Sequence, residues 1–231
     1  MVESIFQLIS RLPQHPSLKH VFGVEVIDVT NNTRLDITAT TQVTRSPPSE
    51  WSMTGNVSTY LSKYPDTSIE TRLLWVRQVG AAIISLHDSG VIHGDVHPGN
   101  ILLEDAGQWA TLINTGIYTA AQAFLPRMTL TERNLYKSSN ENELDHVTNP
   151  TKEMDCYSFS VSVYSMFKGS APYQRNPSRP NLIQEVAYIC SNGHSKLQQP
   201  ANMPANLWVA VHACLQVSSP ANFDNIIRAC K

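Results

Sequence analysis

The chain has 231 residues, of which 42% are hydrophobic and 16% charged, and its formal net charge is −2. It is long enough to bury a sizeable core, as one large domain or one and a fraction, and its near-neutral charge provides no basic surface for nucleic acid or anionic membranes. No apolar run approaches the roughly 20 residues that span a bilayer, and no signal-peptide pattern opens the chain, so we expect a cytoplasmic protein without nucleic-acid or membrane partners.

The first predicted elements are a short helix and a hairpin. A helical pattern covers residues 3–12, and two strands are predicted over 21–29 and 35–43. Residues 31–33 read Asn-Asn-Thr, which is typical of the turn between two strands. A polar link with two prolines follows over residues 44–51.

The clearest predicted helix covers residues 68–87. Trp75 and Leu86 lie on one apolar face of it, and the polar stripe opposite is narrow. We therefore expect this helix to be buried on most sides. Two short apolar strands are predicted after it, over 101–103 and 109–113.

The second half of the chain is predicted to be mainly helical. Residues 117–150 are polar and poorly periodic, which is typical of a long functional or disordered loop. A second largely apolar helix is predicted over 155–168, and further helices over 181–192, 204–217 and 222–230.

The segment between the long helix and the first short strand carries the strongest functional signal. Residues 93–100 read HGDVHPGN, which places the carboxylate of Asp95 five residues before the carboxamide of Asn100. Phosphoryl transfer from a nucleotide uses such a pair, because a carboxylate orients the attacking hydroxyl and an amide oxygen helps to hold the metal. Fourteen residues after Asn100, the sequence INTG contains Asn114.

From about Leu8 to about Ile227 the chain resembles the protein kinase superfamily, and in particular the tyrosine-kinase-like proteins that are abundant in fungi. HGDVHPGN resembles the kinase catalytic loop, and INTG stands where kinases carry a metal-binding Asp-Phe-Gly. Other matching segments occur in the family's order: His15-Pro16 for the HPN turn, 55–61 for GxLxxYL, 155–160 for DVYSFG, 169–173 for GxxPY and 207–215 for the LW…CW of the late helices.

The resemblance implies an α+β, protein-kinase-like fold, formed mainly by the helical C-terminal lobe with a partial N-terminal lobe sheet. We expect residues 1–51 to form the partial N-lobe, with the regulatory helix and two strands, and residues 52–231 to form the C-lobe. ATP and Mg²⁺ are the implied cofactors, and a nucleotide and a protein are the implied partners.

The resemblance also assigns the catalytic and binding residues. Asp95 is the expected base or orienting carboxylate, and His97 is its catalytic neighbour, where many protein kinases carry Lys. The HGDxHPxN form is similar to small-molecule phosphotransferases of the aminoglycoside and choline kinase type. Asn100 and Asn114 are the expected nucleotide-binding residues and metal ligands. The spacing of His93, Asp95 and His97 alone does not predict zinc, because no distal ligand set accompanies it.

Three residues are expected to have structural roles. His93 packs beneath the site, and Asp155 accepts backbone hydrogen bonds from the catalytic loop. Glu143 lies in the segment that resembles APEL, but residues 218–223 lack the Arg that partners it in the family. Since an unpaired buried carboxylate is costly, we expect Glu143 to be exposed or to have another partner.

Several departures from the family predict weakened catalysis. Asn114 replaces the Asp that holds magnesium, which removes an anionic ligand. Thr115 replaces a Phe, and Gly94 replaces the Arg that contacts a loop phosphate in many relatives. The sequence has no GxGxxG and no VAIK-like Lys. We therefore expect a truncated and degenerate kinase domain, either a natural remnant or an incomplete gene product.

Two classes of function follow from these features. The favoured one is a pseudokinase, a kinase-fold binding or scaffold module without efficient phosphoryl transfer. The alternative is an active protein or small-molecule phosphotransferase that uses Asp95 and Asn100, and a decayed gene product without a role is a third reading. All versions of the kinase hypothesis require the side chains of Asp95, Asn100 and Asn114 to converge.

Overall fold

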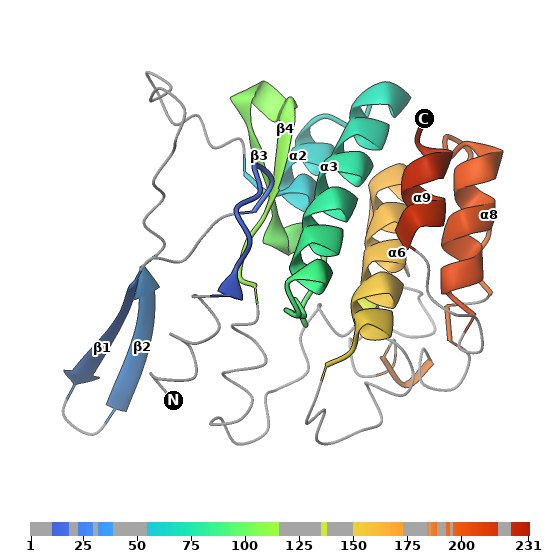
Figure 1. The fold of residues 1–231 in the computed structure, drawn as a ribbon. Coiled ribbons are helices and arrows are strands. Elements are labelled where there is room, and N and C mark those ends of the chain that lie inside the picture. The colour runs from blue at the N-terminus through green and yellow to red at the C-terminus, as the bar shows by residue number, and fades with distance from the viewer. Residues whose placement is uncertain are drawn as a thin grey trace.

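A computed structural model describes residues 11–18, 23–29, 32–38, 55–115, 135–137, 150–172, 184, 186–188, 193–194, 196–216 and 223–231. Helices and small antiparallel hairpins make up this part of the chain, so the predicted α+β class is confirmed (Figure 1). In chain order the elements are β1 (Gly23–Val29), β2 (Asn32–Thr38), α2 (Val57–Lys63), α3 (Ile69–Asp88), the 3₁₀ turn η1 (Pro98–Asn100), β3 (Ile101–Glu104), the 3₁₀ turn η2 (Asp105–Gly107), β4 (Trp109–Leu112), α6 (Lys152–Lys168), α8 (Ala205–Cys214) and α9 (Phe223–Ala229).

The first hairpin is formed by β1 and β2, whose antiparallel register sets Val29 opposite Asn32. Only residues 30 and 31 separate the two strands, so the turn predicted at 31–33 is misplaced. Asn32 and Thr33 belong to β2, which begins three residues earlier than predicted. The register pairs Thr33 with Asp28 and Asn32 with Val29, and the Asn-Asn-Thr composition did not indicate that two of its residues would pair as strand.

The central helix is α3, which confirms the helix predicted over 68–87. Its N-terminus is capped by Ser68, whose hydroxyl accepts a hydrogen bond from the backbone N–H of Thr71 at 3.1 Å. Trp75 and Leu86 are fully buried, as their shared apolar face predicted. The helix contacts β4, α6 and α9, so it lies at the centre of the core.

The helix α6 is buried from Asp155 to Phe167, although its sequence is rich in serine. Ser160, Ser162 and Ser165 are buried, and each hydroxyl donates to the backbone carbonyl four residues earlier, at 2.7, 2.7 and 3.0 Å. These hydroxyls are therefore satisfied within the helix. Thr151 caps the N-terminus, and Gly169 ends the helix with a φ of 77°, a left-handed conformation that glycine adopts without strain.

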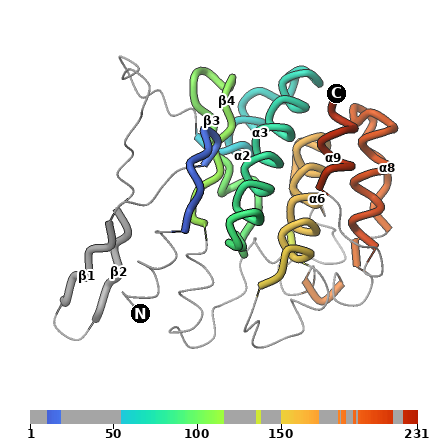
Figure 2. Tube along the Cα trace, viewed as in Figure 1, coloured from blue at the N-terminus to red at the C-terminus, as the bar shows by residue number. Residues whose placement is uncertain are grey.

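The second hairpin is formed by β3 and β4. Hydrogen bonds join it to α3 on one side and to the N-terminal segment on the other. The indole N–H of Trp75 donates to the carbonyl of Gly107 in η2 at 2.7 Å. On the opposite edge, the backbone N–H of Leu112 donates to the carbonyl of Ser17 at 2.8 Å. Figure 2 shows the segment 11–18 running beside this hairpin. The strands predicted over 101–103 and 109–113 are confirmed to within one residue.

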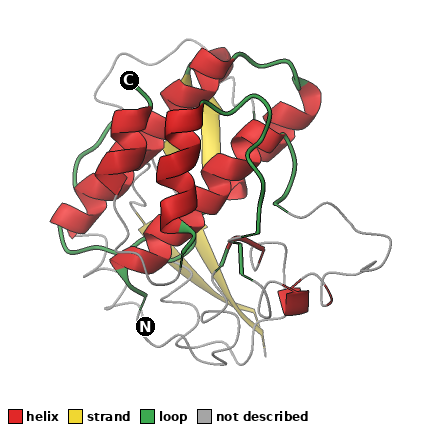
Figure 3. Ribbon diagram, turned by 90° about the vertical axis from the view of Figure 1, so that its right-hand side faces the viewer, coloured by secondary structure: helices red, strands yellow, loops and turns green. Residues whose placement is uncertain are grey.

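The helices α3, α6, α8 and α9 form one packed body, which faces the viewer in Figure 3. Its centre contains the fully buried side chains of Phe159, Leu207 and Ile226, one from each of the last three helices. Arg72 of α3 is also buried, and all its hydrogen bonds to the described residues are to backbone carbonyls. Its acceptors are Pro65 at 2.7 Å, Thr67 at 3.0 Å, Phe167 at 3.4 Å and Met166.

Two separate short segments are attached to α6 through a buried histidine. His194 receives the hydroxyl proton of Tyr157 at its Nδ1, over 2.6 Å, and donates from Nε2 to the carbonyl of Leu135 at 2.8 Å. Burial lowers the pKa of His194 from 6.5 to about 4, so the ring is neutral and both hydrogen bonds have a fixed direction. The segment 135–137 also reaches the loop over residues 93–100, where the rings of Tyr136 and His97 lie 6.0 Å apart.

The remaining sequence predictions have mixed outcomes. The helices α6, α8 and α9 confirm those predicted over 155–168, 204–217 and 222–230. Of the helix predicted over 181–192, only 184 and 186–188 are described, and these are helical. Helix α2 was not predicted. The helix over 3–12 and the loop over 117–150 fall almost entirely outside the described residues. No helix in the described part of the chain has the length and apolar character to cross a membrane.

Candidate active site

The loop that carries Asp95 is held from below by the carboxylate of Asp155. Asp155 lies in the first turn of α6 and is 1% exposed. Its Oδ2 accepts the backbone N–H of His93 at 2.8 Å, and its Oδ1 accepts that of Gly94 at 2.8 Å. The same Oδ2 lies 2.9 Å from Nε2 of His87, in the last turn of α3. The hydrogen bonds expected between Asp155 and this loop are therefore present.

The buried imidazole of His93 connects the loop to the end of β4. Its Nδ1 accepts the backbone N–H of Asp95 at 3.1 Å, so the ring proton is on Nε2, which donates to the carbonyl of Ile113 at 2.8 Å. Burial lowers the pKa of His93 below its ordinary value of 6.5, and the carboxylate of Asp155 partly opposes that shift. A neutral ring with both nitrogens bonded is a positioning group for the loop.

Asp95 and Asn100 are joined directly. The amide Nδ2 of Asn100 donates to the backbone carbonyl of Asp95 at 2.8 Å and to its Oδ2 at 3.0 Å. Both side chains are more than nine-tenths buried. Asn100 ends the 3₁₀ turn η1, whose proline at the first position supplies a preset φ and needs no N–H partner. The turn therefore brings the amide back over the carboxylate.

His97 lies on the other side of the same carboxylate. Its Nε2 is 3.7 Å from Oδ2 of Asp95, and its Nδ1 accepts the backbone N–H of Gly99 at 3.1 Å. Because Nδ1 is an acceptor, the proton of the ring is on Nε2 and faces Asp95. A Cβ added at Gly99 would lie 2.7 Å from Cε1 of His97, so this ring position requires glycine at 99. Gly99 was not predicted as a site residue, because HPGN contains no signal for it beyond the small residue itself.

Asn114 reaches the site from the end of β4. Its Nδ2 donates to Oδ1 of Asn100 at 3.0 Å, and its backbone has a φ of 63°, a left-handed conformation that Asn tolerates better than most residues. Thr115, which follows, is buried, and its hydroxyl has no hydrogen-bond partner among the described residues.

The predicted site residues are thus largely brought together. Asp95, His97, Asn100 and Asn114 form one connected group, and His93 and Asp155 lie beneath it. Glu143 lies outside the described residues. His87, the third partner of Asp155, was not predicted, since a histidine at the end of a long helix carries no sequence signal of its own.

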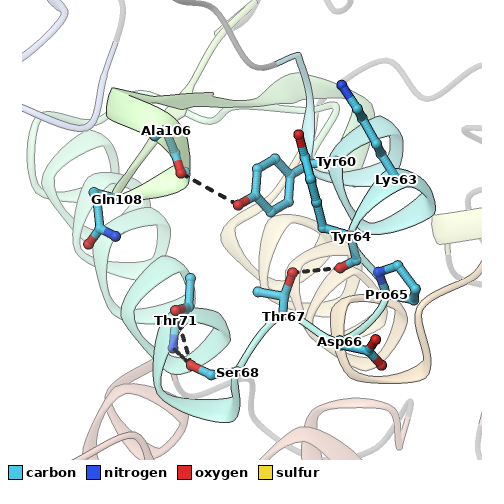
Figure 4. A pocket seen from close by; sticks show the side chains of 11 residues that line it. Tyr60, Lys63, Tyr64, Pro65, Asp66, Thr67, Ser68, Thr71, Ala106 and Gln108 are labelled. Carbon is cyan, nitrogen blue, oxygen red and sulfur yellow. Dashed lines mark hydrogen bonds between the residues drawn. The ribbon is translucent and has the colours of Figure 1, made fainter.

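A hollow of about 440 Å³ lies elsewhere, between α2, the connection to α3 and the turn η2 (Figure 4). The hydroxyl of Tyr60 donates across it to the carbonyl of Ala106 at 3.4 Å, and the hydroxyl of Thr67 donates to the carbonyl of Tyr64 at 2.6 Å. None of the predicted site residues lines this hollow. It is therefore distinct from the group around Asp95.

Comparison with known proteins shows the family of the chain as a whole. The family described as "Protein kinase domain" matches residues 26–222. The chain belongs to the protein kinase domain family. The α+β, kinase-like fold predicted from the sequence is therefore confirmed in full, and the two hairpins and the helical body belong to a kinase domain.

The kinase domain is similar to curated serine/threonine kinases. Serine/threonine-protein kinase PknE of Mycobacterium tuberculosis is 34% identical over 172 residues, which cover 66% of this chain and 30% of that protein. PkaA of Streptomyces coelicolor is 24% identical over 153 residues, covering 66% and 27%. Human ULK1 is 28% identical over 128 residues, covering 52% and 12%. The chain therefore spans less than a third of the length of these relatives. The fungal, tyrosine-kinase-like subtype stays a prediction.

Protein kinases generally use ATP with Mg²⁺, which sets a requirement for the donor atoms at this site. Magnesium prefers carboxylate and phosphate oxygens in octahedral geometry. Here Asn114 turns an N–H toward Asn100, and Oδ1 of Asn100 accepts that N–H. The described residues contain no cluster of three His, Cys, Asp or Glu side chains suited to a metal. The residues at the predicted magnesium position therefore do not fit the ion.

Proposed function

We propose that this kinase domain transfers phosphoryl groups poorly or not at all and acts as a pseudokinase, a module that binds a protein partner. The hydrogen bond from Asn114 to Asn100 carries the proposal. It makes residue 114 a neutral hydrogen-bond donor, where phosphoryl transfer from ATP needs an anionic ligand for the metal. The family binds ATP and a protein substrate. The proposal does not depend on whether this chain binds ATP, and its ATP affinity is to be measured.

The expected loss of rate is large. Removing one preorganised charged or hydrogen-bonding group from an active site typically costs about 3 kcal/mol of transition-state stabilisation. Since each 1.36 kcal/mol is a factor of ten, we expect phosphoryl transfer to be slower by at least about a hundredfold than with an aspartate at this position.

Two neighbouring positions support the same conclusion. Gly94 gives its N–H to Asp155 and has no side chain, so no guanidinium is present there to bind a phosphate on the activation segment. Thr115 buries a hydroxyl that has no hydrogen-bond partner among the described residues, at a position where the family has a large aromatic ring. Control by phosphorylation of that segment through residue 94 is therefore not part of the proposed function.

The other assigned roles remain part of this proposal. Asp95 is the catalytic carboxylate and His97 is its catalytic neighbour. Both are retained in a domain that transfers phosphoryl groups poorly or not at all. The burial and hydrogen bonds of His93 and Asp155 support structural roles for both. The structural role of Glu143 and the division of the domain into residues 1–51 and 52–231 stay predictions.

A second candidate function is an active protein or small-molecule phosphotransferase. The observation that favours it is the pair of hydrogen bonds from Asn100 to Asp95. The loop that carries them is itself hydrogen-bonded to Asp155. A carboxylate held in this way is positioned to orient an acceptor hydroxyl. The same group is therefore compatible with catalysis if the phosphates are neutralised by other means.

A phosphotransfer assay with labelled ATP and Mg²⁺ distinguishes the two candidates. The full chain is compared with Asp95→Asn, which removes the carboxylate, and with Asn114→Asp, which restores the family residue. A generic protein substrate and a panel of hydroxyl-bearing small molecules serve as acceptors. Calorimetric titration with ATP, with and without Mg²⁺, is run in parallel.

We expect no transfer by the unmodified chain above the level of Asp95→Asn. A rate that Asp95→Asn abolishes would overturn the pseudokinase proposal and establish the second candidate. Transfer that appears only in Asn114→Asp would support the proposal and locate the defect at residue 114.

A further inference from the structure

The direction of the hydrogen bonds between Asn114, Asn100 and Asp95 is fixed by chemistry. The backbone carbonyl of Asp95 can only accept, so Asn100 must turn its Nδ2 toward it. This leaves Oδ1 of Asn100 facing residue 114. Because Oδ1 is a hydrogen-bond acceptor, the side chain at 114 can bond to it directly only as a donor. Asn114 therefore presents its Nδ2 to that oxygen, at 3.0 Å.

An aspartate at 114 could not make this contact. Two oxygens without a hydrogen between them would face each other at the distance that Nδ2 and Oδ1 now span, and a cation or a proton would have to lie between them. The backbone offers no reason for the difference, because Asp tolerates the left-handed φ of 63° about as well as Asn does. The amide thus supplies the positive end of an N–H dipole at the place where the carboxylate needs a cation.

The position of residue 114 relative to Asn100 is fixed by two backbone hydrogen bonds of the preceding residue, Ile113. The backbone N–H of Ile113 donates to the carbonyl of Asn100 at 3.0 Å, and the carbonyl of Ile113 accepts Nε2–H of His93 at 2.8 Å. Protein groups alone make both contacts. Asn114 is therefore presented to Asn100 whether or not an ion is in solution.

We propose that the amide of Asn114 takes the structural place of a divalent cation, so that the catalytic loop is assembled without metal and this domain is indifferent to Mg²⁺ and Mn²⁺. The inference deepens the proposed function, because both rest on the hydrogen bond between residues 114 and 100. It makes a claim that the proposed function does not make, about the stability and metal binding of the site and not about its rate of catalysis.

Thermal unfolding of the full chain in EDTA and in increasing MgCl₂ or MnCl₂, at constant ionic strength, tests the inference. Asn114→Asp is the key variant. Asn114→Gly is the matched control, since glycine keeps the left-handed backbone but provides neither a donor nor a ligand. All three proteins are measured without nucleotide, so the probe is the metal alone.

We expect the Tm of the unmodified chain to be the same in EDTA and in either metal. Asn114→Asp is expected to unfold about 2–4 °C lower in EDTA, and to regain Tm saturably with Mn²⁺ or Mg²⁺ as the new carboxylate binds the ion. Asn114→Gly is expected to be similarly destabilised in EDTA and to gain nothing from metal. Recovery of the glycine variant would place the metal elsewhere and overturn the inference.

A second measurement uses only the unmodified chain and remains decisive if a variant fails to fold. Mn²⁺ is paramagnetic and broadens NMR signals close to it. We expect the side-chain amide signals of Asn100 and Asn114 to be unaffected by Mn²⁺. Their selective broadening, or a saturable rise of the unmodified chain's Tm with Mg²⁺, would overturn the inference.

The two proposals can fail separately. Phosphoryl transfer by a chain whose Tm is unaffected by Mg²⁺ and Mn²⁺ would overturn the proposed function and leave the inference standing. Metal binding at residues 100 and 114 in a chain that transfers nothing would overturn the inference and leave the proposed function standing.

Discussion

The carboxylate of Asp155 and the imidazole of His87 lie 2.9 Å apart in the core, and they join the first turn of α6 to the last turn of α3. The ring of His87 also packs edge-on against Phe223 of α9, with 5.3 Å between the ring centroids. Since Asp155 also accepts two backbone N–H groups of the loop that carries Asp95, that loop is bonded directly to the contact between the helices.

Asp155→Asn is expected to destabilise the protein by about 3 kcal/mol, because an amide can accept on one side only and its NH₂ would face an N–H donor. Urea unfolding followed by circular dichroism measures the change. Asp224→Asn is the control, since Asp224 is an exposed carboxylate in the first turn of α9, and it should cost less than about 1 kcal/mol. Equal effects of the two substitutions would contradict the role given to Asp155.

Stability should fall as the pH is lowered through the range set by His194. The pKa of this residue is about 4 in the folded protein and 6.5 when unfolded, so the unfolded chain binds the proton first. The stabilisation is therefore fully present above pH 6.5 and is lost as the pH falls toward 4, by up to about 3 kcal/mol.

Unfolding free energies measured between pH 7 and pH 4.5 test this dependence. His194→Gln does not titrate, and its amide can still donate to the carbonyl of Leu135. The slope of stability against pH should be shallower in this variant than in the unmodified chain. An unchanged slope would assign the pH dependence to other groups, of which buried His93 has a pKa shifted in the same direction.

Arg72→Lys is expected to destabilise the domain by about 2–3 kcal/mol. The guanidinium of Arg72 donates to carbonyls before α3 and at the end of α6, and an ammonium group cannot reach both sets from one position. Thermal unfolding compares it with Arg228→Lys, an exposed arginine with local contacts only. A similar Tm for both variants would show that the buried network contributes little.

Thr115→Val and Thr111→Val should each leave the protein as stable as before or make it more stable by about 1 kcal/mol. Both hydroxyls are buried and lack a hydrogen-bond partner among the described residues, so each is desolvated without compensation. Valine keeps the shape of the side chain and removes that cost. Denaturant unfolding measures each change, and a loss of more than 1 kcal/mol at either position would reveal a partner for its hydroxyl.

Much of the helical body could be predicted because its signals are local. Apolar periodicity and a Ser cap define α3, and two short apolar runs around a turn define β3 and β4. The site residues from Asp95 to Asn114 could also be predicted, because a single loop and one hairpin bring them together. Asp155 could be assigned only through the resemblance to kinases, because its partners lie about sixty residues away.

The remaining features depend on contacts that a linear pattern does not contain. Arg72 is buried because carbonyls just before α3 and at the end of α6 accept its protons, which its place in the sequence of α3 does not indicate. The direction of the bond from Asn114 to Asn100 depends on the turn η1 and on the positive φ at 114. From the sequence, Asn114 could be recognised as a lost carboxylate, but not as a donor to its neighbour.

The serines of α6 have a consequence for how this helix tolerates mutation over evolutionary time. Each hydroxyl at 160, 162 and 165 donates to a carbonyl that already accepts the backbone N–H of the helix, so replacing it by alanine orphans no other group. Alanine also has the higher helix propensity. Lineages can therefore exchange serine and alanine at these sites one at a time, and the hydropathy of α6 can drift while the helix stays in the core.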